Sequence, residues 1–322
     1  MKLIQREDLD KLLDFDYIFK KSKEGFAAFS NGQTVTPPFT VFEIPESGGS
    51  IHFKTGYVRG EKYFAWKYSG AFYGNEKLGL SNFLGLFLVF NSQTGQVEAV
   101  INDKGHLTDY RTGVAGAIAT TTLARKNSET VAVIGTGVQA RLQIKFLMKV
   151  MPFKSLNVFG RTKTEVEKYC SEIQNEFPKL KVNVCETVKE TVQNADIIYT
   201  VTYSKESLIK SEWIKDGTHI TAVGACEPSM QELDSAILQR ASIVAVDSIE
   251  MTAKNGELHH ALEKGLIAKD KAIELGTIIS NNIKRREKDI TVCDLVGLGF
   301  QDAVIGAAVC ERALEKKLER NN

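Results

Sequence analysis

The chain has few of the side chains that build disulfide or metal sites. Its 322 residues include five cysteines and five histidines, with no C-x-x-C pair and no H-E-x-x-H motif. An odd number of widely spaced cysteines is typical of reduced thiols, and no zinc pattern is present. The adjacent His259 and His260 lie in HHALEKG, which we interpret as a helix without metal. We therefore expect no metal and a cytoplasmic protein.

Long apolar runs and an excess of one charge are also missing. No stretch approaches the roughly 18 apolar residues of a membrane span, and the charged N-terminal segment does not resemble a secretory signal. Forty-one Lys and Arg balance 40 Asp and Glu, for a net charge of +1. This balance gives no overall reason to bind nucleic acid or an anionic membrane. The length is enough for about two domains.

The first third of the chain predicts a mostly antiparallel sheet with one helix. Residues 1–22 predict an amphipathic helix, and residues 34–103 predict strands. The strand segments are rich in β-branched and aromatic residues between glycine and asparagine breaks. They are FTVFEI, SIHFKTGYV, KYFAWKYSG, LGLFLVFN and GQVEAVIN.

From about residue 109 the pattern changes. RTGVAGAIATTTLARK predicts a helix of small residues, and apolar runs such as VAVIG, LNVFG, ADIIYTVT and HITAVGA then alternate with amphipathic segments. This alternation favours a parallel sheet with crossover helices. QDAVIGAAVCERALEKKLER predicts a final helix. The expected fold class is α/β, with a Rossmann-type doubly wound domain and a mostly antiparallel α+β domain.

The sharpest motif is VAVIGTGVQARLQIKFL. The strand Val131 to Ile134 leads into Gly135-Thr136-Gly137 and a helix through Ala140, which is the G-x-G-x-x-A variant of the dinucleotide fingerprint. The first glycine permits the tight turn, the second lets backbone approach a pyrophosphate, and the alanine lets helix and strand pack. The helix N-terminus offers free N–H groups to the phosphates. The predicted cofactor-binding residues here are Gly135, Thr136, Gly137, Val138 and Gln139.

The end of the second strand of this domain bears on the choice of cofactor. NAD enzymes usually place a carboxylate there, for the ribose 2′-hydroxyl. Here Gly160 is followed by Arg161, Thr162 and Lys163. A guanidinium with a hydroxyl suits a 2′-phosphate, so Arg161 and Thr162 predict NADP(H), with NAD possible. The alternative is that these charges are simply solvated.

Several motifs in order resemble the ornithine cyclodeaminase/mu-crystallin family. They are the lysine in FAWKYSG, then LTDYRTGVAGAIAT, VAVIGTGVQA, ADIIYTVT, DGTHITAVGACEPSMQELD and GLGFQDAV. The resemblance implies a homodimer that binds NAD(P). It also implies a Rossmann domain at 113–299, and a domain of 1–112 with 300–322 that binds substrate and dimerises. Members include cyclodeaminases, alanine dehydrogenases and imino-acid reductases.

The resemblance also implies roles for single residues. Arg111 matches an arginine that grips the substrate carboxylate, and Lys67 matches the active-site lysine. Lys54 stands at the offset of a second carboxylate-binding arginine. Near the nicotinamide, the resemblance points to Thr200, Thr202 and Gly297. We expect Asp302 to be a helix cap or an internal hydrogen-bond partner and not a catalyst.

One departure from the family bears on the reaction. Many members have an aspartate that handles the substrate amine where this chain has Cys226. A mostly neutral thiol cannot pair with an ammonium, which weighs against ornithine cyclodeamination. The sequence therefore favours an NADP(H)-dependent reductase of cyclic or linear imino acids, or the reverse amino-acid dehydrogenase. The alternatives are an ornithine cyclodeaminase that uses another acid, such as Glu227, and a nucleotide-binding protein without turnover.

Overall fold

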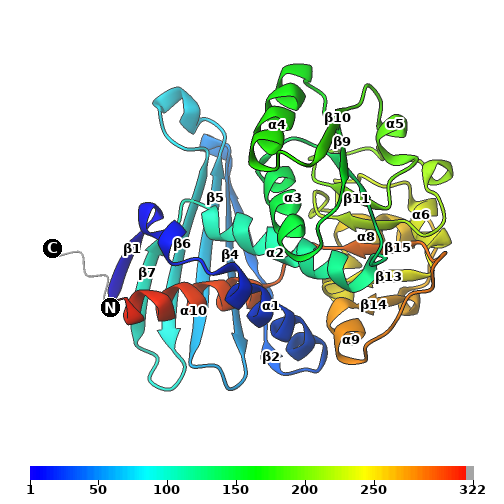
Figure 1. The fold of residues 1–322 in the computed structure, drawn as a ribbon. Helices are drawn as coiled ribbons and strands as arrows, with labels where there is room; N and C mark the ends of the chain where they lie inside the picture. Colours follow the sequence, from blue (N-terminus) through cyan, green and yellow to red (C-terminus); the bar gives the residue numbers. More distant parts are fainter. Residues whose placement is uncertain (317–322) are drawn as a thin grey trace. The chain divides into compact units, whose positions relative to one another are not determined.

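The chain forms two compact units, described here from a computed structural model that places residues 1–316 (Figure 1). Unit 1 comprises Met1–Arg111 and the chain from Leu298 onward, and unit 2 comprises Thr112–Gly297. Helix α2 (His106–Leu123) contains the first boundary between them. The functional division expected for 1–112 with 300–322 and for 113–299 stays a prediction.

Unit 1 is built on a seven-stranded sheet in the order β1-β7-β6-β5-β4-β2, with β3 paired to β4. All its pairs are antiparallel except that of β1 with β7. The strands are β1 (Lys2–Gln5), β2 (Thr34–Val35), β3 (Thr40–Ile44), β4 (Gly49–Val58), β5 (Tyr63–Phe72), β6 (Phe83–Asn91) and β7 (Val97–Asn102). The mostly antiparallel sheet predicted for residues 34–103 is confirmed.

The two faces of this sheet differ in what covers them. Along β5, Tyr63, Ala65 and Lys67 are buried, whereas Trp66 is 40% exposed, as the alternation of a half-buried strand requires. Helix α10 (Gly299–Glu315) packs on β4, β5 and β6, and α1 (Phe15–Ser30) packs beside α10 (Figure 1). The face that carries Lys67 is therefore the one under the helices.

The prediction of a helix over residues 1–22 is wrong. Residues Lys2–Gln5 pair in parallel with β7, a 3-10 helix spans Arg6–Lys11, and α1 begins only at Phe15. Asp14 caps α1, since its Oδ1 accepts a hydrogen bond from the Tyr17 N–H at 3.1 Å. The edge of β7 captures a segment whose own periodicity favours a helix. The last residues of the expected final helix, 317–320, lie outside the described residues.

Unit 2 holds an eight-stranded sheet in the order β10-β9-β8-β11-β12-β15-β13-β14. All its pairs are parallel. The strands are β8 (Thr130–Ile134), β9 (Ser155–Phe159), β10 (Lys181–Val184), β11 (Ile197–Thr200), β12 (His219–Ala222), β13 (Ile243–Val246), β14 (Ala272–Glu274) and β15 (Thr291–Asp294). The first strand, β8, lies between β9 and β11. The chain order reverses there, which is where such sheets bind nucleotides.

Helices connect these strands, and the predicted doubly wound fold is confirmed. The helices are α3 (Val138–Val150), α4 (Lys163–Glu176), α5 (Val188–Val192), α6 (Ser235–Arg240), α7 (Ile249–Thr252), α8 (Gly256–Glu263) and α9 (Leu275–Ser280). Short 3-10 helices span Pro45–Ser47, Asn75–Leu78, Ser211–Trp213 and Lys269–Lys271. Strands β8, β11 and β12 are buried almost throughout, as their apolar sequences predict. Within residues 1–316 no helix is long and apolar enough to cross a membrane.

The start of α10 lies directly against the backbone of β4. A Cβ atom at Gly56 would be 2.5 Å from the carbonyl carbon of Gly299 and from the Phe300 nitrogen, and one at Gly299 would overlap the Thr55 carbonyl. Only residues without a side chain allow this approach. It brings the first turn of α10 down onto the face of the sheet that carries Lys67.

We predict that Gly56→Ala lowers the free energy of unfolding by about 1–3 kcal/mol, because α10 must move off the sheet. Urea unfolding followed by circular dichroism measures this. Gly74→Ala is the matched control, since Gly74 has a negative φ and a Cβ there would meet nothing within 4 Å. We expect it to change the free energy by less than about 0.5 kcal/mol. Equal stability of the two variants would contradict the tight contact.

Candidate active site

A buried lysine and a buried carboxylate form the centre of the candidate site in unit 1. Lys67 on β5 is 2% exposed and Asp302 on α10 is fully buried. The Lys67 Nζ lies 3.0 Å from Asp302 Oδ2. A cation buried this deeply needs a counter-ion, and Asp302 provides it. The structure therefore makes Asp302 an internal partner, one of the two roles expected for it.

Arg111 joins the same carboxylate from α2. Its Nε donates to Asp302 Oδ1 at 3.2 Å, and its Nη1 donates to Gln301 Oε1 at 3.3 Å. Gln301 Oε1 also accepts from the Leu298 N–H at 2.8 Å, which fixes the amide. Within residues 1–316 the Arg111 Nη2 makes no hydrogen bond, and the Lys67 ammonium forms an ion pair with Asp302 alone. Donors on both cations therefore remain available to an anion.

Burial and neighbouring charges decide the protonation of this group. Loss of solvation, opposed by Asp302 and helped by the charges of Arg111 and Lys54, lowers the pKa of Lys67 to about 8. Burial alone would raise the pKa of Asp302, but Lys67 and Arg111 outweigh it and hold that pKa below its usual value. The carboxylate is thus ionised at neutral pH, and Lys67 is a cation close to its titration point.

Lys54 lies directly opposite Lys67 in the pairing of β4 with β5, so both side chains are on one face of the sheet. Its Nζ is 4.8 Å from the centroid of the Phe39 ring. Two cations facing each other repel, which is why Lys54 contributes to the low pKa of Lys67. The structure brings Lys54 to the site, and its contact with a substrate carboxylate stays a prediction.

Asp103 is a member of this cluster that sequence reasoning missed. It is fully buried, its Oδ2 accepts from the Leu107 N–H at 2.9 Å, and its charge acts on Lys67. Burial raises the pKa of Asp103 to about 6. In a sequence, an aspartate just before a helix predicts a helix cap. No sequence pattern indicates that it lies near a lysine on another strand. Three cations, Lys54, Lys67 and Arg111, thus outnumber two carboxylates.

In unit 2, the glycine-rich turn after β8 has the geometry that its sequence predicts. Gly135 has φ +115°, and a Cβ there would lie 2.9 Å from the Val201 carbonyl oxygen. Gly137 is the N-cap of α3, and a Cβ there would meet nothing within 4 Å. Val138, the next residue, is 55% exposed. Open space therefore lies over the helix N-terminus, which fits a dinucleotide pyrophosphate.

The residues expected to choose the cofactor lie on the surface next to this turn. Arg161, Thr162 and Lys163 are exposed after β9. Thr162 is the N-cap of α4, yet its side chain makes no capping hydrogen bond, so its hydroxyl is available. A Cβ at Gly160 would lie 3.1 Å from the Thr136 Cγ2, so this strand end packs against the glycine-rich turn. Recognition of a 2′-phosphate stays a prediction.

Of the three residues expected near the nicotinamide, Thr202 and Gly297 are held by buried carboxylates. Thr200 is fully buried at the end of β11. Thr202 donates its N–H (2.6 Å) and its hydroxyl (2.7 Å) to Glu232 Oε1, and the Gly297 N–H donates to Asp247 Oδ2 at 2.6 Å. These bonds hold the loops beyond β11 and β15. Contact of Thr200, Thr202 or Gly297 with a nicotinamide stays a prediction.

Glu232 was not singled out from the sequence. Its Oε2 also accepts the Gly224 N–H at 3.0 Å, so one buried side chain joins the loops after β11 and β12. Burial raises its pKa to about 7, although the bonds from Thr202 and Gly224 oppose this. In the sequence, Glu232 is part of DGTHITAVGACEPSMQELD, one of the motifs that carry the family resemblance, but nothing local indicates what its side chain binds.

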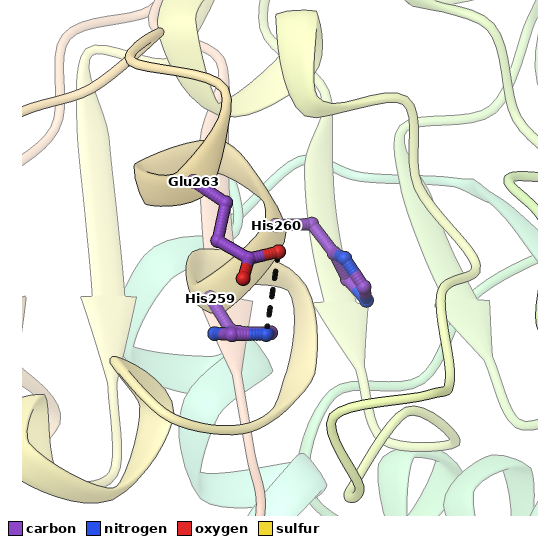
Figure 2. A group of neighbouring side chains, drawn as sticks. All are labelled: His259, His260 and Glu263. Atoms are coloured by element: carbon purple, nitrogen blue, oxygen red, sulfur yellow. Dashed lines mark ion pairs between the residues drawn. The ribbon is translucent and has the colours of Figure 1, made fainter.

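One group of possible metal ligands occurs among the described residues, on α8: His259, His260 and Glu263. The His259 Nε2 lies 3.5 Å from Glu263 Oε2. Figure 2 shows this pair, with His260 to one side of it. The His260 Nε2 is 2.8 Å from the Met230 carbonyl, so this ring is held by backbone from another segment. We interpret the group as a helix-surface ion pair beside a packed histidine, and the expectation of no metal stays a prediction.

A model of the ornithine cyclodeaminase/mu-crystallin family matches residues 2–317. The chain belongs to this family. The resemblance read from the motifs is thereby confirmed. An uncharacterised cyclodeaminase of Sinorhizobium fredii is 35% identical over 322 residues, which cover 98% of this chain and 97% of the relative.

Solved structures of similar proteins share the whole fold of this family member. The Δ1-pyrroline-2-carboxylate reductase of Thermococcus litoralis, in complex with NADH and L-proline, is 29% identical with a TM-score of 0.91, and the match covers 100% of both chains. An archaeal alanine dehydrogenase dimer with bound NAD is also 29% identical, with a TM-score of 0.92 over 99% of this chain and 98% of that one.

We predict that Asp302→Asn lowers the free energy of unfolding by about 3–5 kcal/mol, because Lys67 and Arg111 lose their shared counter-ion in the interior. Urea unfolding at neutral pH measures the change. Asp16→Asn, at an exposed acid in the first turn of α1, is the control. Adding Lys67→Met to Asp302→Asn removes one of the two uncompensated charges and should restore part of the loss. An Asp302→Asn variant as stable as the parent would contradict the central role of this carboxylate.

Proposed function

We propose that this family member is an NADP(H)-dependent oxidoreductase that reduces imino acids, cyclic or linear, to amino acids, or runs the reverse dehydrogenation. The observation that carries the proposal is the buried group of Lys67, Arg111 and Asp302, with donors left over on both cations. An α-imino acid brings one carboxylate and one C=N bond. The excess of cations in unit 1 suits the carboxylate. The glycine-rich turn of unit 2 suits the nucleotide that must reduce the C=N bond.

Each residue of unit 1 has a defined task in this scheme. Arg111 presents its Nη2 to the substrate carboxylate while Asp302 and Gln301 hold the rest of the guanidinium in place. Lys67, protonated below a pH of about 8, adds a second charge-assisted bond. Fixing the carboxylate at two points orients the adjacent imine carbon. The nitrogen of an iminium substrate is already protonated. Its reduction therefore needs no residue of this chain to act as a base.

Unit 2 supplies the binding site for the cofactor. Bound NADP(H) supplies the hydride that converts the imine carbon to the amine carbon. The N–H groups of Gly137 and Val138 and the start of α3 would hold its pyrophosphate. Arg161 and Thr162 would hold a 2′-phosphate, since no carboxylate stands at the end of β9 to repel it. NAD remains the second cofactor, because the two solved relatives contain NADH and NAD.

The surroundings of Cys226 favour reduction over cyclodeamination. Cys226 is exposed, and so is Glu227, the acid expected as its substitute. Asp234 is already the N-cap of α6, with its Oδ1 accepting the Ala236 N–H at 3.0 Å. No carboxylate at these positions is held ready to deprotonate a side-chain amine, which ring closure of ornithine requires.

The outer face of the unit 1 sheet supports the proposal of a homodimer. On the side of the sheet opposite Lys67 and α10, aromatic rings stack in pairs: Phe53 with Trp66 at 5.0 Å between centroids, and Phe64 with Phe90 at 4.9 Å. An extended apolar patch of this kind is typical of a protein interface. The alanine dehydrogenase relative is a dimer. We propose that this chain pairs with a second copy through the outer face of its own unit 1 sheet.

The proposed activity predicts loss of NADPH absorbance with Δ1-pyrroline-2-carboxylate or with pyruvate and ammonium, and a higher kcat/KM for NADPH than for NADH. Arg111→Lys should raise the KM for the imino acid by about tenfold or more, because a lysine cannot replace the guanidinium fork. It should leave NADPH binding unchanged. Steady-state assays with both cofactors measure these quantities.

Two results would count against this function, and a third against the role of Arg111. Formation of proline from ornithine would identify a cyclodeaminase, and tight NADPH binding without turnover of any imino acid would identify a binding protein. An unchanged KM in Arg111→Lys would remove this residue from the substrate site.

The pH dependence should report Lys67. Its pKa in the free enzyme is lowered to about 8, so it is charged below that pH and neutral above it. We predict that binding of a carboxylate weakens as pH rises through about 8. The probe is cyclopentanecarboxylate, an inhibitor without a titrating nitrogen, and the measurement is its inhibition constant between pH 6 and 10. Lys67→Arg keeps its charge over this range and should flatten the curve. A curve that is flat in the parent enzyme would contradict the assignment.

A further inference from the structure

Arg141 lies one turn into α3, and its side chain folds back over the glycine-rich turn. Its Nη1 donates to the carbonyl oxygens of Thr136, in a short bond, and of Gly137, at 3.2 Å. The dinucleotide motif places no requirement on this position, where the sequence reads G-T-G-V-Q-A-R. The side chain nevertheless binds the two peptide groups that lead from the turn into α3.

Those two contacts fix the direction of two N–H groups. In a trans peptide the C=O and the following N–H point in opposite directions, and none of the peptide bonds in residues 1–316 is cis. The Thr136 carbonyl shares its peptide with the Gly137 N–H, and the Gly137 carbonyl shares its peptide with the Val138 N–H. When Arg141 holds both carbonyls on its side, both N–H groups face away from it. They are the first free donors at the start of α3.

The guanidinium is itself held from outside the turn. Its Nε and Nη2 lie 2.7 and 2.6 Å from Glu172 Oε2 on α4, and it stands 5.3 Å from the centroid of the Tyr169 ring. The Tyr169 hydroxyl donates to the Ala140 carbonyl at 3.1 Å. Helix α4 therefore fixes Arg141, and Arg141 fixes the turn. A surface ion pair with Glu172 alone would need no contact with the carbonyls of the turn.

We propose that Arg141 is a positioning residue for the cofactor, which presets the Gly137 and Val138 N–H groups to receive the pyrophosphate. The proposal rests on the proposed binding of a dinucleotide by unit 2. Donors that are already aligned lose little freedom when an anion binds, so the preset turn binds more tightly than a mobile one. The positive charge of Arg141 on the carbonyl side also polarises both peptides toward the phosphate.

The test compares two ligands of the parent protein and of Arg141→Ala: NADPH, and adenosine 2′-monophosphate, which has no pyrophosphate. Fluorescence titration and calorimetry give the dissociation constants. We expect Arg141→Ala to raise the dissociation constant of NADPH by about ten- to a hundredfold. This is the change that loss of well-formed hydrogen bonds to a charged group produces. We expect adenosine 2′-monophosphate to bind as before. Equal weakening of both ligands would mean that the whole nucleotide site is loosened or that Arg141 binds the 2′-phosphate, and would overturn the proposal.

Two further variants separate the contact with the turn from the ion pair. Glu172→Gln removes the charge of the partner but leaves Arg141 over the turn, so NADPH should bind nearly as tightly as before. Arg141→Lys keeps the charge, but one ammonium cannot replace the fork that spans Glu172 and both carbonyls, so it should lose much of the affinity. A loss in Glu172→Gln as large as in Arg141→Ala would assign the effect to the ion pair.

Failure of this proposal is distinguishable from failure of the proposed function. A parent protein that binds neither NADPH nor NADH would overturn the function itself. A parent protein that binds NADPH, with an Arg141→Ala variant that binds it equally well and remains folded by circular dichroism, would overturn only the role of Arg141.

Discussion

The candidate site depends on a single buried carboxylate that neutralises two buried cations. Lys67, Arg111 and Asp302 come from segments far apart in the chain, and each would be expensive to bury without the others. Asp302 reaches the sheet only because Gly56 and Gly299 let α10 lie against β4. Unit 1 must therefore be closed by the C-terminal helix. This requirement explains why its sequence is discontinuous, with all of unit 2 inserted between Arg111 and Leu298.

The two units arrange their buried charges in opposite ways. In unit 1, side-chain cations surround a carboxylate and leave donors for an anion. In unit 2, the loops at the carboxyl ends of the strands are held by buried carboxylates that accept backbone N–H groups, as Glu232 does from Thr202 and Gly224. The turn that would face the pyrophosphate is instead held through its carbonyls, by Arg141. Anchoring the carbonyls leaves the N–H groups of that turn for a ligand.

Local sequence predicts those features whose cause is local. The turn at Gly135 follows from a strand, two spaced glycines and a helix, and the strands of both sheets follow from their apolar spacing. Residues 1–22 were predicted wrongly because pairing with β7 overrides their helical periodicity. The sequence predicted Asp302 only as a cap or an internal partner, and it did not indicate Asp103 at all. Both residues lie beside Lys67 through tertiary contacts that no local pattern shows. Glu232 was missed for the same reason, because its partner Thr202 lies far from it in the chain. Arg141 bonds nearby carbonyls, but the dinucleotide motif places no requirement on its position.

The low pKa of Lys67 connects the charge of the site to its proposed substrate. Burial, Arg111 and Lys54 all disfavour the ammonium, and Asp302 only partly compensates. A carboxylate that binds beside Lys67 adds a second counter-ion, so it must raise that pKa, and by linkage the protein takes up a fraction of a proton as the acid binds. An amine or a neutral ligand would bring no such compensation. In the proposed function the cluster would therefore select ligands by their charge and not by their side chain, which suits a site for more than one imino acid.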